Sequence, residues 1–210
     1  MDRWPVWDFK NTMQMPKAPS LLMWLLIAAM VLVFSSARQP ATSSGEAAGR
    51  KSTSYVSRTA TTSIDWMTVE DAAGKLQKEK RPVLIDLYTT WCGWCRQMDK
   101  KTYSNKQVVQ YLQEKFYTVK VDAETKATIT WNGKTYHFNP DYRSNEFALY
   151  LTHGRLEFPT TIIIPPGGEP QAIPGYMEPK ELELLVKYFG EGNYNKVSFD
   201  EYQKNFKTSW

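Results

Sequence analysis

The chain has 210 residues, of which 42% are hydrophobic and 23% are charged, and its formal net charge is +4. This length suffices for one ordinary domain with additional segments. Because the positive charge is small and no basic tract concentrates it, the composition gives no support for nucleic-acid binding.

The N-terminal part of the chain has the pattern of a targeting segment. Residues 1–20 are mixed, whereas residues 21–37 begin with an uninterrupted apolar run that ends at Phe34. The run is short for a bilayer-spanning helix and typical of a signal peptide, and small residues before Arg38 suit cleavage near Ala37. We therefore expect a cleaved signal peptide or an uncleaved signal anchor. A buried core helix is the remaining alternative, although the run has no polar face.

A linker follows the apolar run. Residues 38–63 are rich in Ala, Ser, Thr and Gly and show no apolar period, so we expect a flexible tether. Basic residues lie on both sides of the apolar run and leave its orientation open.

Regular elements are predicted from about residue 64 onward. Thr68 can cap a first helix with one apolar face, and residues 83–88 are nearly all apolar, as in a central strand. A second helix is expected over residues 92–102. Ser104 is predicted to cap a third helix, with Gln107 completing a capping box.

The second half of the chain continues this α/β pattern. Residues 117–121 alternate as a second strand, so the order strand, helix, strand predicts a parallel pair. The β-branched residues 160–164 are expected to form a hairpin with residues 171–173. Pro179 is predicted to open the last long helix, and Gly190 to stop it.

The chain has only two cysteines, Cys92 and Cys95, placed where a strand ends and a helix opens. Zinc normally needs four ligands, and the only further candidates are His137 and His153, so we expect no metal site. A c-type haem site requires histidine after the second cysteine, where this chain has Arg96. Iron–sulfur binding would need more thiolates.

The position of the pair favours dithiol–disulfide chemistry. Free backbone N–H groups and the helix dipole lower the pKa of a thiol at a helix N-terminus, so we expect Cys92 to be the exposed nucleophile. Cys95, one turn deeper, is expected to resolve the mixed disulfide. The alternative is a static disulfide in a membrane-tethered binding or assembly module, although so short a loop closes little chain entropy.

Residues 86–95, Asp-Leu-Tyr-Thr-Thr-Trp-Cys-Gly-Trp-Cys, resemble the thioredoxin signature. Residues 120–122 resemble the next strand of that superfamily, residues 158–160 resemble its cis-proline segment, and Gly175 also matches. The resemblance covers roughly residues 64–190 and looks closest to exported thioredoxin-like domains, such as the C-terminal domain of the membrane electron carrier DsbD. It implies a thioredoxin fold, an α/β domain with a central mixed sheet flanked by helices.

The resemblance also implies roles for residues around the cysteines. Asp86 would accept a proton from Cys95, with its pKa raised by desolvation, unless it is an ordinary acid on a solvated face. Lys120 would either pair with Asp86 or be solvated. The tryptophans beside the cysteines would contact partner proteins or merely cover the site. The implied substrate-binding residues, with the proline in cis, are Trp91, Gly93, Trp94, Phe158, Pro159 and Thr160.

Two features depart from thioredoxin. The dipeptide between the cysteines is Gly-Trp rather than Gly-Pro, so the redox potential cannot be carried over. Residues 125–157 form an insertion with an Asn-Gly hairpin signal at 132–133 and a predicted helix over 144–151. The hairpin either lies beside the active-site face or extends the sheet at its periphery. Residues 191–210 are expected to form a C-terminal extension with a short docked helix.

Together these patterns predict a protein thiol–disulfide oxidoreductase of the reductase or isomerase type, with the direction of electron flow open. It would need no cofactor, because the two cysteines carry the electrons. Its partners would be protein disulfides or thiols and an upstream electron donor or acceptor. Its expected location is extracytoplasmic, in the periplasm, either anchored in the inner membrane by residues 21–37 or released after cleavage near Ala37.

Overall fold

The structure, a computed structural model, describes residues 63–210. The predicted segments 1–20 and 21–37, and all but the last residue of the predicted linker 38–63, lie outside the described residues. Within residues 63–210, no helix is long and apolar enough to cross a membrane.

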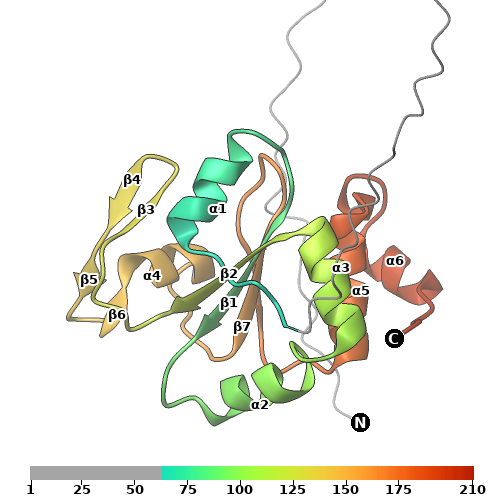
Figure 1. The fold of residues 1–210 in the computed structure, drawn as a ribbon, viewed down its shortest axis with the longest axis horizontal. Helices are drawn as coiled ribbons and strands as arrows, with labels where there is room; N and C mark the ends of the chain where they lie inside the picture. Colours follow the sequence, from blue (N-terminus) through green and yellow to red (C-terminus); the bar gives the residue numbers. More distant parts are fainter. Residues whose placement is uncertain (1–62) are drawn as a thin grey trace, which may run out of the picture. The chain divides into compact units, whose positions relative to one another are not determined.

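A mixed four-stranded sheet in the order β2-β1-β7-β8 forms the centre of the fold (Figure 1). Strand β1 (Val83–Tyr88) pairs in parallel with β2 (Tyr117–Asp122) and antiparallel with β7 (Thr160–Ile164). Strand β8 (Gln171–Pro174) adds to β7 as the predicted hairpin. The thioredoxin-like α/β fold inferred from the resemblance is therefore confirmed.

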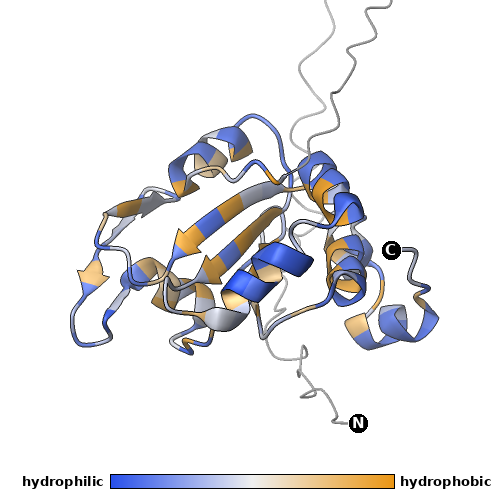
Figure 2. Ribbon diagram, turned by 60° about the horizontal axis from the view of Figure 1, so that its bottom comes forward, coloured by the Kyte–Doolittle hydropathy of each residue, from blue (hydrophilic) through white to orange (hydrophobic). Residues whose placement is uncertain are grey.

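Helices cover both faces of the sheet, and their outward surfaces are largely hydrophilic (Figure 2). Side chains alternate along β1, so Val83, Ile85 and Leu87 join one apolar cluster, whereas Leu84 joins the other. The first cluster includes residues of α1 and α4, and the second includes residues of α2, α3 and α5. The helices are α1 (Val69–Leu76), α2 (Gly93–Lys101), α3 (Lys106–Lys115), α4 (Glu146–Thr152), α5 (Pro179–Gly190) and α6 (Phe199–Asn205), with a 3-10 turn η3 (Asn193–Asn195).

Helix α1 has the predicted cap, since the Thr68 side chain accepts a hydrogen bond from the N–H of Asp71. The predicted cap of α3 is wrong by one residue. Asn105 caps that helix, because its Oδ1 accepts from the N–H groups of both Gln107 and Val108. The Ser104 hydroxyl instead donates to a carbonyl of the preceding helix.

The predicted C-terminal end of α5 is also early by about one residue, because Gly190 was expected to end the helix and instead belongs to it. Gly190 is the last helical residue and Glu191 is the C-cap, while Gly192 adopts a positive φ of 68°. A Cβ added to Gly190 would lie 2.9 Å from the Tyr111 hydroxyl and 3.0 Å from the Phe116 ring. The glycine at this position therefore permits close packing of α5 on α3, rather than ending the helix.

The insertion contains the predicted hairpin, β3 (Ile129–Trp131) and β4 (Lys134–Tyr136). Asn132 and Gly133 form its turn with positive φ values of 51° and 77°. Of the two alternatives for the hairpin, the extension of the central sheet is wrong, because the hairpin forms a separate two-stranded sheet. It packs on α1 instead, and the N–H of Thr130 donates to the Glu70 carboxylate.

The helix predicted over 144–151 begins later. Ser144–Asn145 form strand β6, which pairs with β5 (Phe138–Asn139), and α4 begins at Glu146. Asn145 is fully buried and caps α4 through Oδ1, while its Nδ2 donates to the carbonyls of Thr125 and Ala127. This side chain therefore ties together the start and the middle of the insertion.

The C-terminal extension docks on the domain, as predicted. In α6, the Phe199 and Tyr202 rings each lie 5.2 Å from the Tyr188 ring of α5. The last three residues bind the fully buried Glu183 carboxylate through hydroxyl and backbone N–H donors. Lys187 donates to the same carboxylate at 2.7 Å.

Candidate redox site

The two cysteines form a disulfide at the start of α2, with their Cα atoms 5.3 Å apart. Cys92 is the N-cap of the helix, and its backbone N–H donates to the carbonyl of Thr89 in the turn that follows β1. The N–H of Cys95 donates to the Cys92 sulfur at 3.0 Å. This helix terminus therefore directs a backbone donor at the Cys92 sulfur, an arrangement that stabilises negative charge there.

The burial of the pair differs from expectation. Cys92 was predicted to be exposed, but in the disulfide it is only 5% exposed, close to the 3% of Cys95. Its sulfur is bonded to that of a residue inside the first turn, which places both sulfurs below the surface. The exposed groups here are the neighbouring rings of Trp91 and Trp94, at 62% and 64%.

Aromatic side chains from three segments meet beside the disulfide. Trp91 packs edge to face with Phe158, with ring centroids 5.9 Å apart. Trp94 packs on Tyr176, which follows β8, at 5.5 Å. Sequence analysis named the first three of these residues but missed Tyr176, because nothing in the local sequence brings the end of β8 to α2.

The segment before β7 has the implied conformation, with the Phe158–Pro159 peptide bond in cis. Thr160 is buried and is the register partner of Leu87 in β1, so this segment lies close to the end of β1 from which the motif emerges. The carbonyl of Pro159 accepts the N–H of Gly175 at 2.8 Å.

Asp86 is a buried carboxylate on the same sheet face as Leu84, and only 2% of it is exposed. Lys120 is its register partner in β2 and lies with Nζ 2.9 Å from Oδ2 of Asp86. Burial raises the pKa of Asp86 to about 6, although the Lys120 charge opposes that rise. Asp86 is therefore desolvated rather than on a solvated face, and of the two alternatives for Lys120 the structure shows the pairing.

Asp99 is a second carboxylate in this cluster, and sequence analysis missed it. Lys120 Nζ forms a short ion pair with Asp99 Oδ1 while it also contacts Asp86, and its ammonium lies 5.0 Å from the Tyr88 ring. The Asp99 charge contributes to the raised pKa of Asp86. The spacing in the sequence could have identified Asp99, because it follows Cys95 by four residues, about one helical turn, and therefore lies on the same face of α2.

Arg96 adds a cation beside the motif. Its Nη1 donates to the carbonyl of Thr90 at 3.0 Å, and its Nη2 lies 3.8 Å from the position of a Cβ added to Gly93. The first turn of α2 therefore carries a guanidinium group as well as the helix N-terminus, and the helix N-terminus favours an anionic sulfur.

Among the described residues, no group of three or more His, Cys, Asp or Glu side chains could hold a metal ion. His137 lies 3.5 Å from the Thr128 hydroxyl, and His153 is the left-handed C-cap of α4. The reactive and ionisable groups at this site are the two sulfurs, the buried carboxylate and the paired lysine.

Curated relatives match parts of the chain. Human spermatogenesis-associated protein 20 is 29% identical over 76 residues, which cover 36% of this chain and 10% of that protein. A chloroplastic thioredoxin Y of Oryza sativa subsp. japonica is 39% identical over 54 residues, covering 26% of this chain and 30% of the relative. The match thus spans about a tenth of the length of the first of these relatives.

Solved structures align with much of this chain at low identity. A structure titled "DsbH Oxidoreductase" is 15% identical, with a TM-score of 0.47, and the alignment covers 70% of this chain and 95% of that one. The oxidised C-terminal domain of DsbD from Neisseria meningitidis is 20% identical, with a TM-score of 0.38, and its alignment covers 61% of this chain and 91% of that one.

The family comparison covers most of the described domain. Residues 46–188, more than half of the chain, match the family Thioredox_DsbH, described as "Protein of unknown function, DUF255". A thioredoxin-like domain with this Cys-x-x-Cys pair indicates a thiol–disulfide oxidoreductase. Because the match extends through the central sheet, the redox helix and the insertion, the chain belongs to the Thioredox_DsbH (DUF255) family of thioredoxin-fold proteins.

Proposed function

We propose that this protein exchanges thiols and disulfides with other proteins through Cys92 and Cys95, as a reductase or isomerase outside the cytoplasmic membrane. The observation that carries this proposal is the disulfide at the N-terminus of α2, with the buried carboxylate of Asp86 on the adjacent strand. The two sulfurs carry the electron pair, so the reaction needs no bound cofactor.

The reaction balances as two successive exchanges. In the reduced protein, the Cys92 thiolate attacks a substrate disulfide, forms a mixed disulfide and releases one substrate thiolate. Cys95 then loses its proton and attacks the Cys92 sulfur, which releases the second substrate thiolate. Two electrons pass to the substrate, and the protein is left with the Cys92–Cys95 disulfide. A dithiol donor returns it to the reduced form.

Asp86 is the proposed proton acceptor for Cys95. Its pKa of about 6 makes it mostly ionised at neutral pH, yet basic enough to take up a proton transiently. Lys120 holds the carboxylate from one side and is itself held by Asp99. The base thus stays in place within an apolar layer.

The exposed aromatic surface is the proposed contact for protein substrates. Trp91 and Trp94 are more than half exposed and flank a disulfide that is itself nearly buried. Gly93 between the cysteines adds no side chain above them, while Phe158, the cis-proline and Thr160 form the neighbouring segment. A partner that covers these rings would bury apolar area around its own disulfide.

Trapping of mixed disulfides tests the order of the thiols. Cys95→Ser should accumulate reductant-sensitive complexes with protein partners on non-reducing gels, because nothing resolves them, whereas Cys92→Ser should accumulate few. Both variants should lose the ability to reduce the disulfides of insulin. Equal trapping by both variants would contradict the assigned order. If neither traps and the wild-type disulfide resists mild reductants, the protein is a binding module with a static disulfide. Equilibration with glutathione then gives the direction of electron flow.

The proposed extracytoplasmic location rests on the apolar run within residues 21–37 and on the need of a thiol couple for a compartment in which it can cycle. Protease added to spheroplasts should degrade the domain, and a reporter fused after Trp210 that works only in the cytoplasm would refute the location. The mass of the mature protein separates the two remaining cases. Loss of the segment up to Ala37 indicates a cleaved signal, and its retention indicates an anchor.

A further inference from the structure

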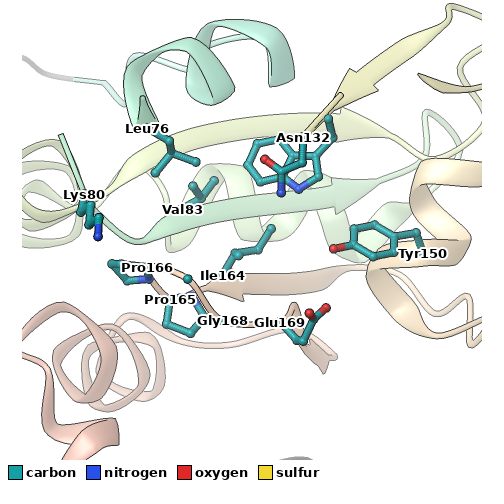
Figure 3. A pocket seen from close by; sticks show the side chains of 12 residues that line it. Leu76, Lys80, Val83, Asn132, Tyr150, Ile164, Pro165, Pro166, Gly168 and Glu169 are labelled. Carbon is teal, nitrogen blue, oxygen red and sulfur yellow. The ribbon is translucent and has the colours of Figure 1, made fainter. Parts of the chain in front are cut away.

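The two ends of β1 present different charge to a partner. At the end where β1 begins and β7 ends lies a cleft of about 380 Å³, lined in part by Trp131 and Asn132 of the insertion hairpin (Figure 3). The charged residues in its lining are Lys80 and Glu169, one of each sign. The disulfide follows the opposite end of β1, so a partner that exchanges with its sulfurs meets the protein there.

At the disulfide end, the outward side of α2 is cationic. Arg96, Lys100 and Lys101 are exposed, and within residues 63–210 none of them forms an ion pair with a carboxylate. We call these three residues the cationic face of α2. The single carboxylate of the helix, Asp99, is held by Lys120 of β2. The cationic face therefore has no paired anion in the part of the chain that the structure describes.

The helical spacing joins the cationic face to the residues beside the sulfurs. Gly93, Arg96 and Lys100 follow one another at i, i+3 and i+7, so they form one row along the helix. Trp94 and Lys101 are seven residues apart and belong to the neighbouring row. Each row begins at a residue between the two cysteines and ends at a lysine. The cationic face therefore continues directly from the exposed aromatic surface.

Helix electrostatics explain the two lysines but not Arg96. Lys100 and Lys101 lie in the last turn of α2, where the helix dipole favours cations, whereas Arg96 lies in the first turn, which contains no acidic residue. Arg96 and Lys100 are also like charges at i and i+4, a spacing that destabilises a helix. Arg96 nevertheless stays beside the motif, because its Nη1 donates to the carbonyl of Thr90 at 3.0 Å. Sequences tend to break local rules at functional positions, so this cation points to an anionic partner.

We propose that the cationic face of α2 binds carboxylate side chains that flank the disulfide of a protein partner, and so selects acidic partners for the exchange reaction. This inference rests on the proposed function, because the partner must bring a disulfide to the cysteines. The partner's carboxylates contact the cationic face, while apolar residues beside its disulfide cover Trp91 and Trp94. Complementary charge of this kind acts mainly on the rate of association.

An anionic membrane is the other possible occupant of a cationic surface. Clusters that bind anionic lipids usually contain about 4–8 cations, more than the cationic face of α2 has. The cationic face also adjoins a nearly buried disulfide, where a partner must deliver a sulfur atom rather than a flat lipid surface. Both observations favour an acidic protein.

Matched disulfide peptides test the preference. Three peptides share one disulfide loop and carry two Glu, two Gln or two Lys residues on each side of it. Each peptide oxidises the reduced full-length protein in a stopped-flow experiment, and its rate is divided by its rate with 2-mercaptoethanol, which corrects for intrinsic disulfide reactivity. At low salt the Glu peptide should react roughly tenfold faster than the Lys peptide, and added salt should shrink this ratio. Equal rates, or a ratio that salt does not change, would overturn the proposal.

Charge removal locates the surface. The double variant Lys100→Gln with Lys101→Gln should reduce the ratio of the Glu-peptide rate to the Lys-peptide rate from roughly tenfold to roughly threefold. The matched control is Lys204→Gln with Lys207→Gln in the C-terminal extension, which removes the same net charge and should keep the ratio. Equal loss in both double variants would assign the effect to net charge and refute the proposed surface.

Binding without exchange separates this inference from the proposed function. Peptides with serine in place of both cysteines are titrated into the oxidised full-length protein labelled with ¹⁵N at tryptophan, with Trp94→Phe assigning the Trp94 indole resonance. The Glu peptide should shift that resonance saturably, with a dissociation constant on the order of 1 mM, and the Lys peptide should not. This result without exchange of any disulfide peptide would refute the oxidoreductase and keep the docking surface.

The absence of a saturable shift with the Glu peptide would overturn the docking surface. Vesicles of phosphatidylglycerol test the membrane. If the vesicles bind, the double lysine variant abolishes that binding and the Glu peptide does not bind, the face belongs to anionic lipid and the proposal is wrong.

Discussion

The buried carboxylate of Asp86 should make the folded protein less stable than it would be with a neutral side chain at that position. The pKa of Asp86 rises from its usual 3.8 to about 6, first because burial disfavours the charged form. That rise corresponds to about 3 kcal/mol of preference for the protonated carboxyl in the folded state. We therefore predict that Asp86→Asn raises the free energy of unfolding at pH 7 by up to about 3 kcal/mol.

The sign of the pH dependence follows from the direction of the shift. Because the folded pKa is the higher one, the folded protein binds more protons than the unfolded chain between pH 3.8 and about 6. Wild-type stability contributed by this group is thus fully present below pH 3.8 and is lost as the pH rises through 6. The stability difference between Asp86→Asn and wild type should be full at pH 7 and vanish near pH 4.

Urea unfolding of the disulfide-intact proteins between pH 4 and 8 measures this difference, with equal m values required for the comparison. Lys120 keeps its pairing with Asp99 in the variant, so the lysine is not left without a counter-charge. Asp99→Asn is the control, because Asp99 is 41% exposed and its removal should not stabilise the fold. An Asp86→Asn protein that is no more stable than wild type at pH 7, or a difference independent of pH, would refute the reasoning. The same variant should resolve mixed disulfides more slowly while Cys92 still attacks at the wild-type rate.

Three further substitutions probe the packing. Burial by itself would raise the pKa of Glu183, but hydrogen bonds from Lys187 and the C-terminal tail lower it to about 2. Glu183→Gln should therefore reduce the free energy of unfolding at pH 7 by about 2–3 kcal/mol. Urea unfolding should show this difference shrinking as the pH falls below about 4.5. Gly190→Ala should lower the melting temperature by about 4 °C or more, because the added Cβ would lie 2.9 Å from the Tyr111 hydroxyl. Asn145→Ala should increase hydrogen exchange in residues 125–152 before it changes that of β1, because the carbonyls of Thr125 and Ala127 lose their donor. Uniform exchange across the domain would contradict this.

The local sequence predicted most of the central fold. Periodicity and capping residues located β1, α1 and the start of α5, because each depends on neighbours within a few positions. The Cys-x-x-Cys pair placed the redox site at the start of α2 for the same reason. The errors at the start of α3 and α4 were also local. Asparagine at the next position offered a better cap than the predicted serine in one case, and strand β6 preceded the helix in the other.

The contacts between distant segments were decided only by the tertiary structure. Lys120 had two equal interpretations in the sequence, and the parallel register of β1 with β2 placed it against Asp86 and Asp99. Pairings such as that of Trp94 with Tyr176 depend on where β8 ends, which no periodic pattern encodes. The cleft likewise arises because the insertion folds onto α1 instead of extending the sheet. Local chemistry therefore determined where the thiols lie along the chain, and packing determined which groups surround them, because side chains far apart in sequence interact only once the sheet register is set.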